Sequence, residues 1–321
     1  MLIQNDLYPT RGDQERLIER KDPILYGWDH PNKCLSESQL TNFEQRGFVL
    51  VPNAFSPAEV ALLKAEVQRV KRQAGAGRNE IWRDAVPAGE RESLLAPERA
   101  SRLLRGLACE RRILDGVMQI VGGPVCLHRA RVHIEDGSHG TAYPWHSEFE
   151  TWHAEDGIPR MRGVEAWVLL ERSEAEGGAL CMLSKSHHIY AACVANGDGA
   201  PRGAAGKREV PRPSFEALLR LRRFGGLAWA QGEAGTLVLC DSNLMYGSSP
   251  GPKGRARSTV MFSYNSLENL PAERPFASRE FRPAPIVSMP FARLKGEFFD
   301  ALVASEGSQR IKPAARARVS A

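Results

Sequence analysis

Short apolar runs separated by Gly- and Pro-containing turns fill the chain from Val125 onward, and they constrain its fold more than any other feature. Each run is rich in β-branched or aromatic residues, which is typical of β-strands. Many short strands at uneven spacing are typical of a jelly-roll barrel. The runs lie at 125–134, 164–170, 179–183, 236–240 and 259–264. We therefore expect a mainly β fold built around a jelly-roll barrel.

Helical patterns precede these strands. Ser36 and Gln39 form a capping box, and Gly47 ends the predicted helix before the strand-like run 48–51. Ser56 and Glu59 begin a second helix, whose apolar residues repeat at helical spacing. A third helical region covers 98–121 and stops at a Gly-Gly-Pro sequence. We expect these helices to buttress the barrel.

The length of 321 residues allows one large domain. We predict a single domain over 1–306, with the helical buttress mainly at 36–122 and the barrel mainly at 125–290. The Gly-, Pro- and Arg-rich segment 196–213 is predicted to be a loop near the barrel mouth. The basic segment 307–321 is predicted to be a disordered tail.

Composition excludes several classes of function. The net charge of +5 is mild and spread along the chain, which does not favour a nucleic-acid partner. The six cysteines form no C-x-x-C pair and are expected to be reduced, mostly buried thiols. Neither a leader-like start nor an apolar run of about 20 residues is present. We expect a cytoplasmic protein that binds no membrane.

One motif carries the chemistry. His146 and Glu148 form a His-x-carboxylate pair within the segment 145–162. Two histidines and one carboxylate on one face of a site hold Fe(II) in mononuclear non-haem oxygenases and leave positions open for co-substrate and dioxygen. His146 and Glu148 are predicted to supply two of those three ligands.

The segment 145–162 resembles the signature of the ectoine hydroxylase branch of the phytanoyl-CoA dioxygenase superfamily, whose members are non-haem Fe(II) and 2-oxoglutarate oxygenases. Further similarity lies at 6–11, 177–180 and 264–269, so it covers most of the chain. The resemblance implies a double-stranded β-helix of the cupin-like kind with flanking helices. It also implies Fe(II) and 2-oxoglutarate as cofactor and co-substrate, a small-molecule substrate and a possible homodimer.

Two of the three ligand positions depart from the family pattern. Glu148 stands where the family has aspartate, which keeps the charge and the oxygen donor. Tyr246 stands where the family has its second histidine, in the sequence Asp-Ser-Asn-Leu-Met-Tyr-Gly-Ser. A phenol has a free pKa of about 10 and binds a metal well only when deprotonated. The third ligand is therefore predicted to be Tyr246 or a relocated histidine.

His133 is the candidate for relocation. Residues 129, 131 and 133 share one face of the predicted strand 125–134 because side chains alternate along a strand. The alternative is that His133 lines the barrel and binds no metal.

The resemblance also suggests residues for co-substrate and substrate. Arg257 lies eleven positions after Tyr246, where the family has the arginine that pairs with the distal carboxylate of 2-oxoglutarate. Thr151, Trp152 and Arg282 match residues that hold ectoine. Arg129 stands where the family has a glutamine that contacts ectoine, and an extra cation there favours an anionic or carboxylated substrate.

Three functions remain open. The first is a hydroxylase-type, 2-oxoglutarate-dependent iron oxygenase that acts on an amino-acid-like or carboxylated small molecule other than ectoine. The second is a catalytically degenerate barrel that serves as a binding or partner subunit. The third is a metalloenzyme with a Tyr-containing ligand set that needs no 2-oxoglutarate.

Overall fold

The computed structural model describes residues 6–31, 33–75, 82–85, 91–135, 143–175, 179–194, 211–248 and 256–271. Its largest sheet has seven strands, all paired antiparallel, in the order β2-β11-β7-β13-β5-β4-β3. In that order the strands are Phe48–Val51, Leu237–Asp241, Gly163–Leu169, Arg257–Ser266, Val125–Glu135, Arg91–Leu95 and Trp82–Ala85.

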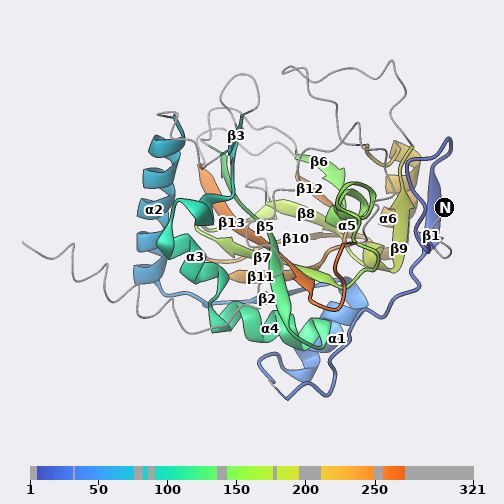
Figure 1. Cartoon of the computed structure of the whole chain (residues 1–321), viewed down its shortest axis with the longest axis horizontal. Coiled ribbons are helices and arrows are strands. Elements are labelled where there is room, and N and C mark those ends of the chain that lie inside the picture. Colours follow the sequence, from blue (N-terminus) through green and yellow to red (C-terminus); the bar gives the residue numbers. More distant parts are fainter. Residues whose placement is uncertain are drawn as a thin grey trace, which may run out of the picture.

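A second sheet lies opposite the first and contains the strands in the order β10-β8-β12-β6. These strands are Leu227–Trp229, Leu180–Leu183, Tyr246–Ser248 and Tyr143–His146. A two-stranded sheet joins β1 (Arg16–Glu19) to β9 (Ile189–Ala192) near the N-terminus (Figure 1). The two larger sheets form a double-stranded β-helix of the jelly-roll, cupin-like kind, as the sequence predicts.

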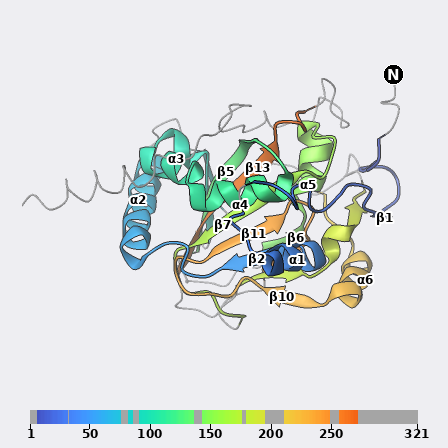
Figure 2. The same cartoon turned by 90° about the horizontal axis from the view of Figure 1, so that it is seen from below.

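The two faces of the seven-stranded sheet have different neighbours. On β5, Ala130, Val132 and Ile134 pack into the core cluster that contains the helices. On the other face, Trp167 of β7 and Met261 of β13 pack with Tyr246 and Met182 of the four-stranded sheet. Figure 2 shows α3 and α4 on one side of β7 and β11, and β10 on the other. The barrel interior therefore lies between the two sheets.

The helices follow the predicted caps, with one difference. In α1 (Glu37–Arg46), Ser36 accepts a hydrogen bond from the Gln39 N–H in a full capping box, and Gly47 ends the helix at φ 86°. Ser56 and Glu59 form the same reciprocal bonds at the start of α2 (Pro57–Gly75).

The third helical region is broken. A 3₁₀ turn (Pro97–Arg99), α3 (Arg102–Ala108) and α4 (Arg111–Val121) divide it. The break occurs because the Cys109 N–H turns back to the Gly106 carbonyl and the Glu110 side chain caps α4. The region is therefore helical as predicted but consists of three pieces.

The five predicted barrel strands appear as β5, β7, β8, β11 and β13, each within two or three residues of its expected bounds. The strands with no counterpart in the prediction are β1, β3, β4, β6, β9, β10 and β12. All six cysteines are free thiols, four of them buried. Among the described residues, no helix is long and apolar enough to span a membrane. Arg282, most of the predicted loop 196–213 and the tail 307–321 lie outside the described residues.

Candidate active site

The backbone register brings the three predicted ligand positions together. His146 ends β6 and Tyr246 begins β12, and the two residues are cross-strand partners. Glu148 opens the short helix α5 (Glu148–Thr151) two residues after His146. The Tyr246 hydroxyl donates to Oε1 of Glu148 at 2.8 Å, and Nε2 of His146 lies 3.5 Å from the same oxygen. Side chains far apart in the sequence therefore converge on one carboxylate oxygen.

The orientation of the His146 ring suits a metal ligand. Its Nδ1 lies 2.9 Å from the Pro144 carbonyl oxygen, which can only accept, so Nδ1 carries the proton. In the neutral ring the lone pair of Nε2 then faces Glu148. A nitrogen lone pair and a carboxylate oxygen repel each other unless a cation, either a proton or a metal ion, lies between them.

The spacing of the donors also fits a metal. A first-row metal ion with bonds of about 2.1 Å separates neighbouring ligand atoms by about 3 Å. The distances of 2.8 and 3.5 Å around Oε1 of Glu148 bracket that value. Tyr246 meets this requirement only as a phenolate, since its hydroxyl proton now occupies the hydrogen bond to Glu148. His146, Glu148 and Tyr246 therefore fit a metal in position, and Tyr246 fits it after losing a proton.

Glu148 is held ionised inside the protein. Only 2% of the residue is exposed, and burial alone would raise its pKa. The positive charge of Arg131, 2.9 Å from Oε1, instead holds the pKa of Glu148 well below its ordinary value. The Trp152 indole donates to the second oxygen at 3.2 Å. Arg131 thus supplies a cation that offsets the negative charge of the site.

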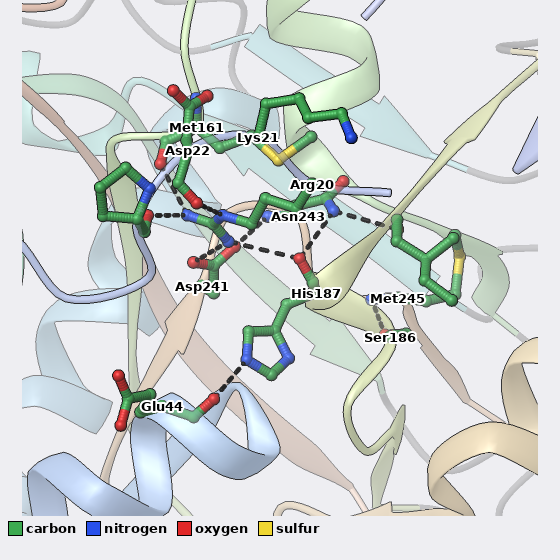
Figure 3. A network of polar contacts seen from close by, with 12 residues as sticks. Arg20, Lys21, Asp22, Glu44, Met161, Ser186, His187, Asp241, Asn243 and Met245 are labelled. Atoms are coloured by element: carbon green, nitrogen blue, oxygen red, sulfur yellow. Dashed lines mark hydrogen bonds and ion pairs between the residues drawn. The ribbon is translucent and has the colours of Figure 1, made fainter. Parts of the chain in front are cut away.

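The Tyr246 ring is fixed from two sides. Its centroid lies 4.5 Å from that of His146 and 4.9 Å from that of Trp167. The preceding segment is anchored by the network in Figure 3, in which Arg20 donates to the Asp241 carboxylate at 2.7 Å. In the same network the Met245 N–H donates to the Ser186 hydroxyl at 2.8 Å. The position of Tyr246 therefore follows from contacts with several segments that lie earlier in the sequence.

Arg129, Arg131 and His133 lie on the inner face of β5, as the alternation predicts. Nδ1 of His133 lies 2.7 Å from the Ser93 hydroxyl on β4. Throughout the described part of the chain, no three His, Cys, Asp or Glu side chains are grouped to hold a metal ion. Relocation of the third ligand to His133 stays a prediction, and the contacts of Tyr246 favour Tyr246 for that position.

Arg129 is not the uncompensated cation that the sequence suggests. Its guanidinium pairs with Asp156, which also lies 2.9 Å from Nε2 of His128. Burial would raise the pKa of Asp156, but the charge of Arg129 and the bond to His128 lower it, so the carboxylate is ionised. Burial lowers the pKa of His128. Because the charges of Arg129 and Asp156 offset each other, this pair changes the shape of the barrel wall more than it changes the net charge of the wall.

The predicted substrate residues have different surroundings. Thr151 borders a small pocket beside His146. The empty volume of this pocket is roughly 200 Å³, part of which is open to solvent. Its lining comprises His146, Ser147, Glu150, Thr151, Ala191, Cys193, Pro211, Pro213 and Met245. Trp152 is fully buried in a separate cluster with Phe149 and Met161, so its described contacts position Glu148.

Arg257, the predicted anchor of the co-substrate, already holds a carboxylate. Its Nε and Nη2 donate to the two oxygens of Glu135 at 2.7 and 2.8 Å. The two residues are cross-strand partners at the end of β5 and the start of β13.

Two residues of the site have no role in the sequence prediction. In the sequence prediction Arg131 only shares a strand face with Arg129 and His133. In the structure Arg131 pairs with Glu148. Glu165 lies inside the barrel on β7, where burial and the charge of Glu148 raise its pKa to about 8. The signal for Glu165 is a carboxylate in the middle of an otherwise apolar strand, Gly163–Leu169.

The similarity to known proteins agrees with this geometry. The family model of phytanoyl-CoA dioxygenase matches residues 43–257. The ectoine dioxygenase of Stutzerimonas stutzeri is 34% identical over 287 residues, which cover 88% of this chain and 94% of that protein. The ectoine dioxygenase of Streptomyces anulatus is 32% identical over 307 residues, covering 91% and 99%. The chain belongs to the phytanoyl-CoA dioxygenase family.

Solved structures lead to the same group within that family. EctD from S. alaskensis with 2-oxoglutarate and 5-hydroxyectoine superposes with a TM-score of 0.79 at 28% identity, covering 91% of this chain and 98% of that one. The same enzyme with bound Fe has a TM-score of 0.78 at 29% identity, with the same coverage. The chain is thus an ectoine hydroxylase-like member, grouped with dioxygenase-type oxidoreductases that use iron and 2-oxoglutarate.

Proposed function

We propose that this chain is a non-haem iron, 2-oxoglutarate-dependent oxygenase of the hydroxylase type, acting on an amino-acid-like or carboxylated small molecule other than ectoine. The observation that carries the proposal is the convergence of His146, Glu148 and Tyr246 on one point inside the barrel. The membership of the family supports it. The cytoplasmic location and the possible homodimer stay predictions.

The residues of the chain have distinct parts in this proposal. His146, Glu148 and Tyr246 hold the metal, with Tyr246 binding as phenolate. Arg131 balances one negative charge next to Glu148, and Trp152 fixes the second carboxylate oxygen. When bound, iron and 2-oxoglutarate together supply the oxidant for hydroxylation. The buried ring of Trp167 packs against Tyr246 and restricts water at that side of the ligand.

The proposed substrate class follows from the barrel wall. At Arg129 a planar guanidinium bound to Asp156 occupies the place that a neutral glutamine has in the ectoine-binding family pattern. A site built for one pattern of hydrogen bonds rejects a ligand that leaves its polar groups unpaired. Thr151 and Glu150 border a small depression beside His146. We infer from these features that ectoine is not the preferred substrate.

Two observations favour the alternative functions. The Glu148 carboxylate is satisfied by Tyr246, Arg131 and Trp152 without a metal, which supports a degenerate barrel that binds small molecules or a partner. Arg257, the predicted anchor of 2-oxoglutarate, is already paired with the carboxylate of Glu135. This pairing supports a metalloenzyme with a Tyr-containing ligand set that needs no 2-oxoglutarate.

Anaerobic titration of the metal-free protein with Fe(II), followed by 2-oxoglutarate, separates these functions. Stoichiometric iron binding and a visible charge-transfer band on adding 2-oxoglutarate would support the oxygenase. Iron binding without the band would favour the 2-oxoglutarate-independent metalloenzyme. No iron binding would favour the degenerate barrel. Glu148→Gln is the control, because it removes the charged ligand and should abolish both signals.

A further inference from the structure

Glu135 and Arg257 form a carboxylate–guanidinium pair at the end of the barrel interior. Residues two apart on a strand share a face, so Glu135 lies on the same face as His133, and Arg257 on the same face as Met261. Met261 belongs to the interior cluster, which places that face inside the barrel. The two Arg257–Glu135 hydrogen bonds, 2.7 and 2.8 Å long, form a parallel fork.

That fork is the arrangement by which an arginine binds the carboxylate of a ligand. The Glu135 side chain therefore makes the same pair of bonds with Arg257 that the distal carboxylate of a dicarboxylate would make. We propose that Glu135 is an internal competitor for 2-oxoglutarate, and that the exchange of Glu135 for the bound carboxylate sets the affinity for this co-substrate. The inference rests on the proposed function, because it concerns the co-substrate of the same site.

Among the described residues, three carboxylates pair with the interior arginines Arg129, Arg131 and Arg257, and exposure identifies Glu135 as the exchangeable one. The side chains of Glu148 and Asp156 are each 3% exposed, whereas that of Glu135 is 16% exposed. A carboxylate released in the interior stays desolvated and without its partner, which is strongly unfavourable. Glu135 lies where water reaches it, so its release costs less.

The charge on Glu135 also opposes a second carboxylate at Arg257. When 2-oxoglutarate binds there, two negative groups share the neighbourhood of one guanidinium, and like charges raise the free energy of the complex. Replacing Glu135 by glutamine removes both the competing hydrogen bonds of a carboxylate and the repulsion. We expect an increase in affinity of about tenfold, the scale of one partly exposed charge pair.

The test measures 2-oxoglutarate binding by calorimetry, anaerobically, on the full-length protein with Fe(II). Glu135→Gln should lower the dissociation constant about tenfold, and Glu135→Ser should do the same if the glutamine variant folds poorly. Arg257→Gln added to Glu135→Gln should cancel the gain. Glu171→Gln is the matched control, because Glu171 pairs with Lys64 and accepts from the Ser258 N–H next to Arg257. It should change the constant less than twofold.

Equal affinity of the wild type and Glu135→Gln would overturn the inference and leave the proposed function standing. An equal gain in Glu171→Gln would also overturn it, because the effect would then follow from net charge. Fe(II) binding with no 2-oxoglutarate binding in any variant would overturn both the inference and the use of this co-substrate.

Discussion

Arg20 is a buried arginine and Arg131 a half-buried one; both pair with carboxylates, but they serve different regions. Arg20 donates to the Asp241 carboxylate and to the backbone carbonyls of Asp22, Pro23, Met161 and His187. These acceptors come from four segments far apart in the sequence (Figure 3). Arg131 pairs with Glu148, which also receives the Tyr246 hydroxyl.

The difference separates support from function. Breaking the hydrogen bonds between Arg20 and its carbonyl acceptors would leave buried polar groups unsatisfied. The network therefore fixes the segment that leads to Tyr246. A carboxylate that already receives several donors, one of them replaceable by a metal, can change partners without unfolding. We infer that the Arg20 region fixes the position of the segment before Tyr246. The region around Arg131 on β5 and Glu148 carries the chemistry of the site.

Arg20→Met tests the support region and has the largest expected effect. It removes the Arg20 hydrogen bonds from the Asp241 carboxylate and from four carbonyls, and loss of one partner of a buried pair costs about 3–5 kcal/mol. The free energy of unfolding from urea denaturation should fall by that amount. Arg111→Gln is the control, since the Arg111 side chain is 60% exposed in its pair with Asp115. A loss below about 1 kcal/mol in Arg20→Met would refute a supporting role.

Metal binding tests the functional region. A metal that binds the folded state stabilises it by about 2.7 kcal/mol at a free concentration one hundred times its dissociation constant. Mn(II) or Fe(II) should therefore raise the melting temperature of the wild type. Glu148→Gln should remove the shift, while Asp115→Asn should keep it. A shift that persists in Glu148→Gln would show that the metal binds elsewhere.

Glu165 gives the functional region its own pH dependence. Burial and Glu148 raise the pKa of Glu165 to about 8, so the folded protein keeps a proton that the unfolded chain loses above about pH 4.5. Stability should fall as pH rises from about 5 to 8, by up to about 1.4 kcal/mol per pH unit. Glu165→Gln should flatten this slope in denaturation measured at pH 6 and pH 8. An unchanged slope would contradict the raised pKa.

His133→Ala has the smallest expected effect. If Tyr246 is the third ligand, removal of the imidazole on β5 should change the Fe(II) dissociation constant less than about threefold, or about 0.7 kcal/mol. Ser93→Ala removes the hydroxyl beside His133 and is the matched variant. Loss of iron binding in His133→Ala alone would favour relocation of the ligand.

Local signals made much of the fold predictable. The capping box at Ser36 and the alternation along β5 depend on residues close in sequence, and both are confirmed. The break between α3 and α4 was not predicted because it depends on a backbone turn at Cys109. The strand β4 was not predicted either, since its place in the sheet depends on pairing with β5.

The positions of the candidate ligands were predictable from motif resemblance, and their partners were not. Glu135 and Arg257 are 122 residues apart, and Arg129 meets Asp156 only because Asp156 lies in the turn after α5. Long-range pairs of this kind depend on sheet register, which a single sequence does not contain. The compensation of Arg129 therefore became visible only in the structure.

The most direct test of the account is the visible absorption spectrum of the protein loaded with Fe(III). A phenolate bound to Fe(III) gives a charge-transfer band, so the wild type should show one and Tyr246→Phe should not. His133→Ala, on β5 of the other sheet, should keep the band and serves as the control. A wild-type protein that binds iron without the band, or a band that persists in Tyr246→Phe, would contradict the assignment of Tyr246 as the third ligand.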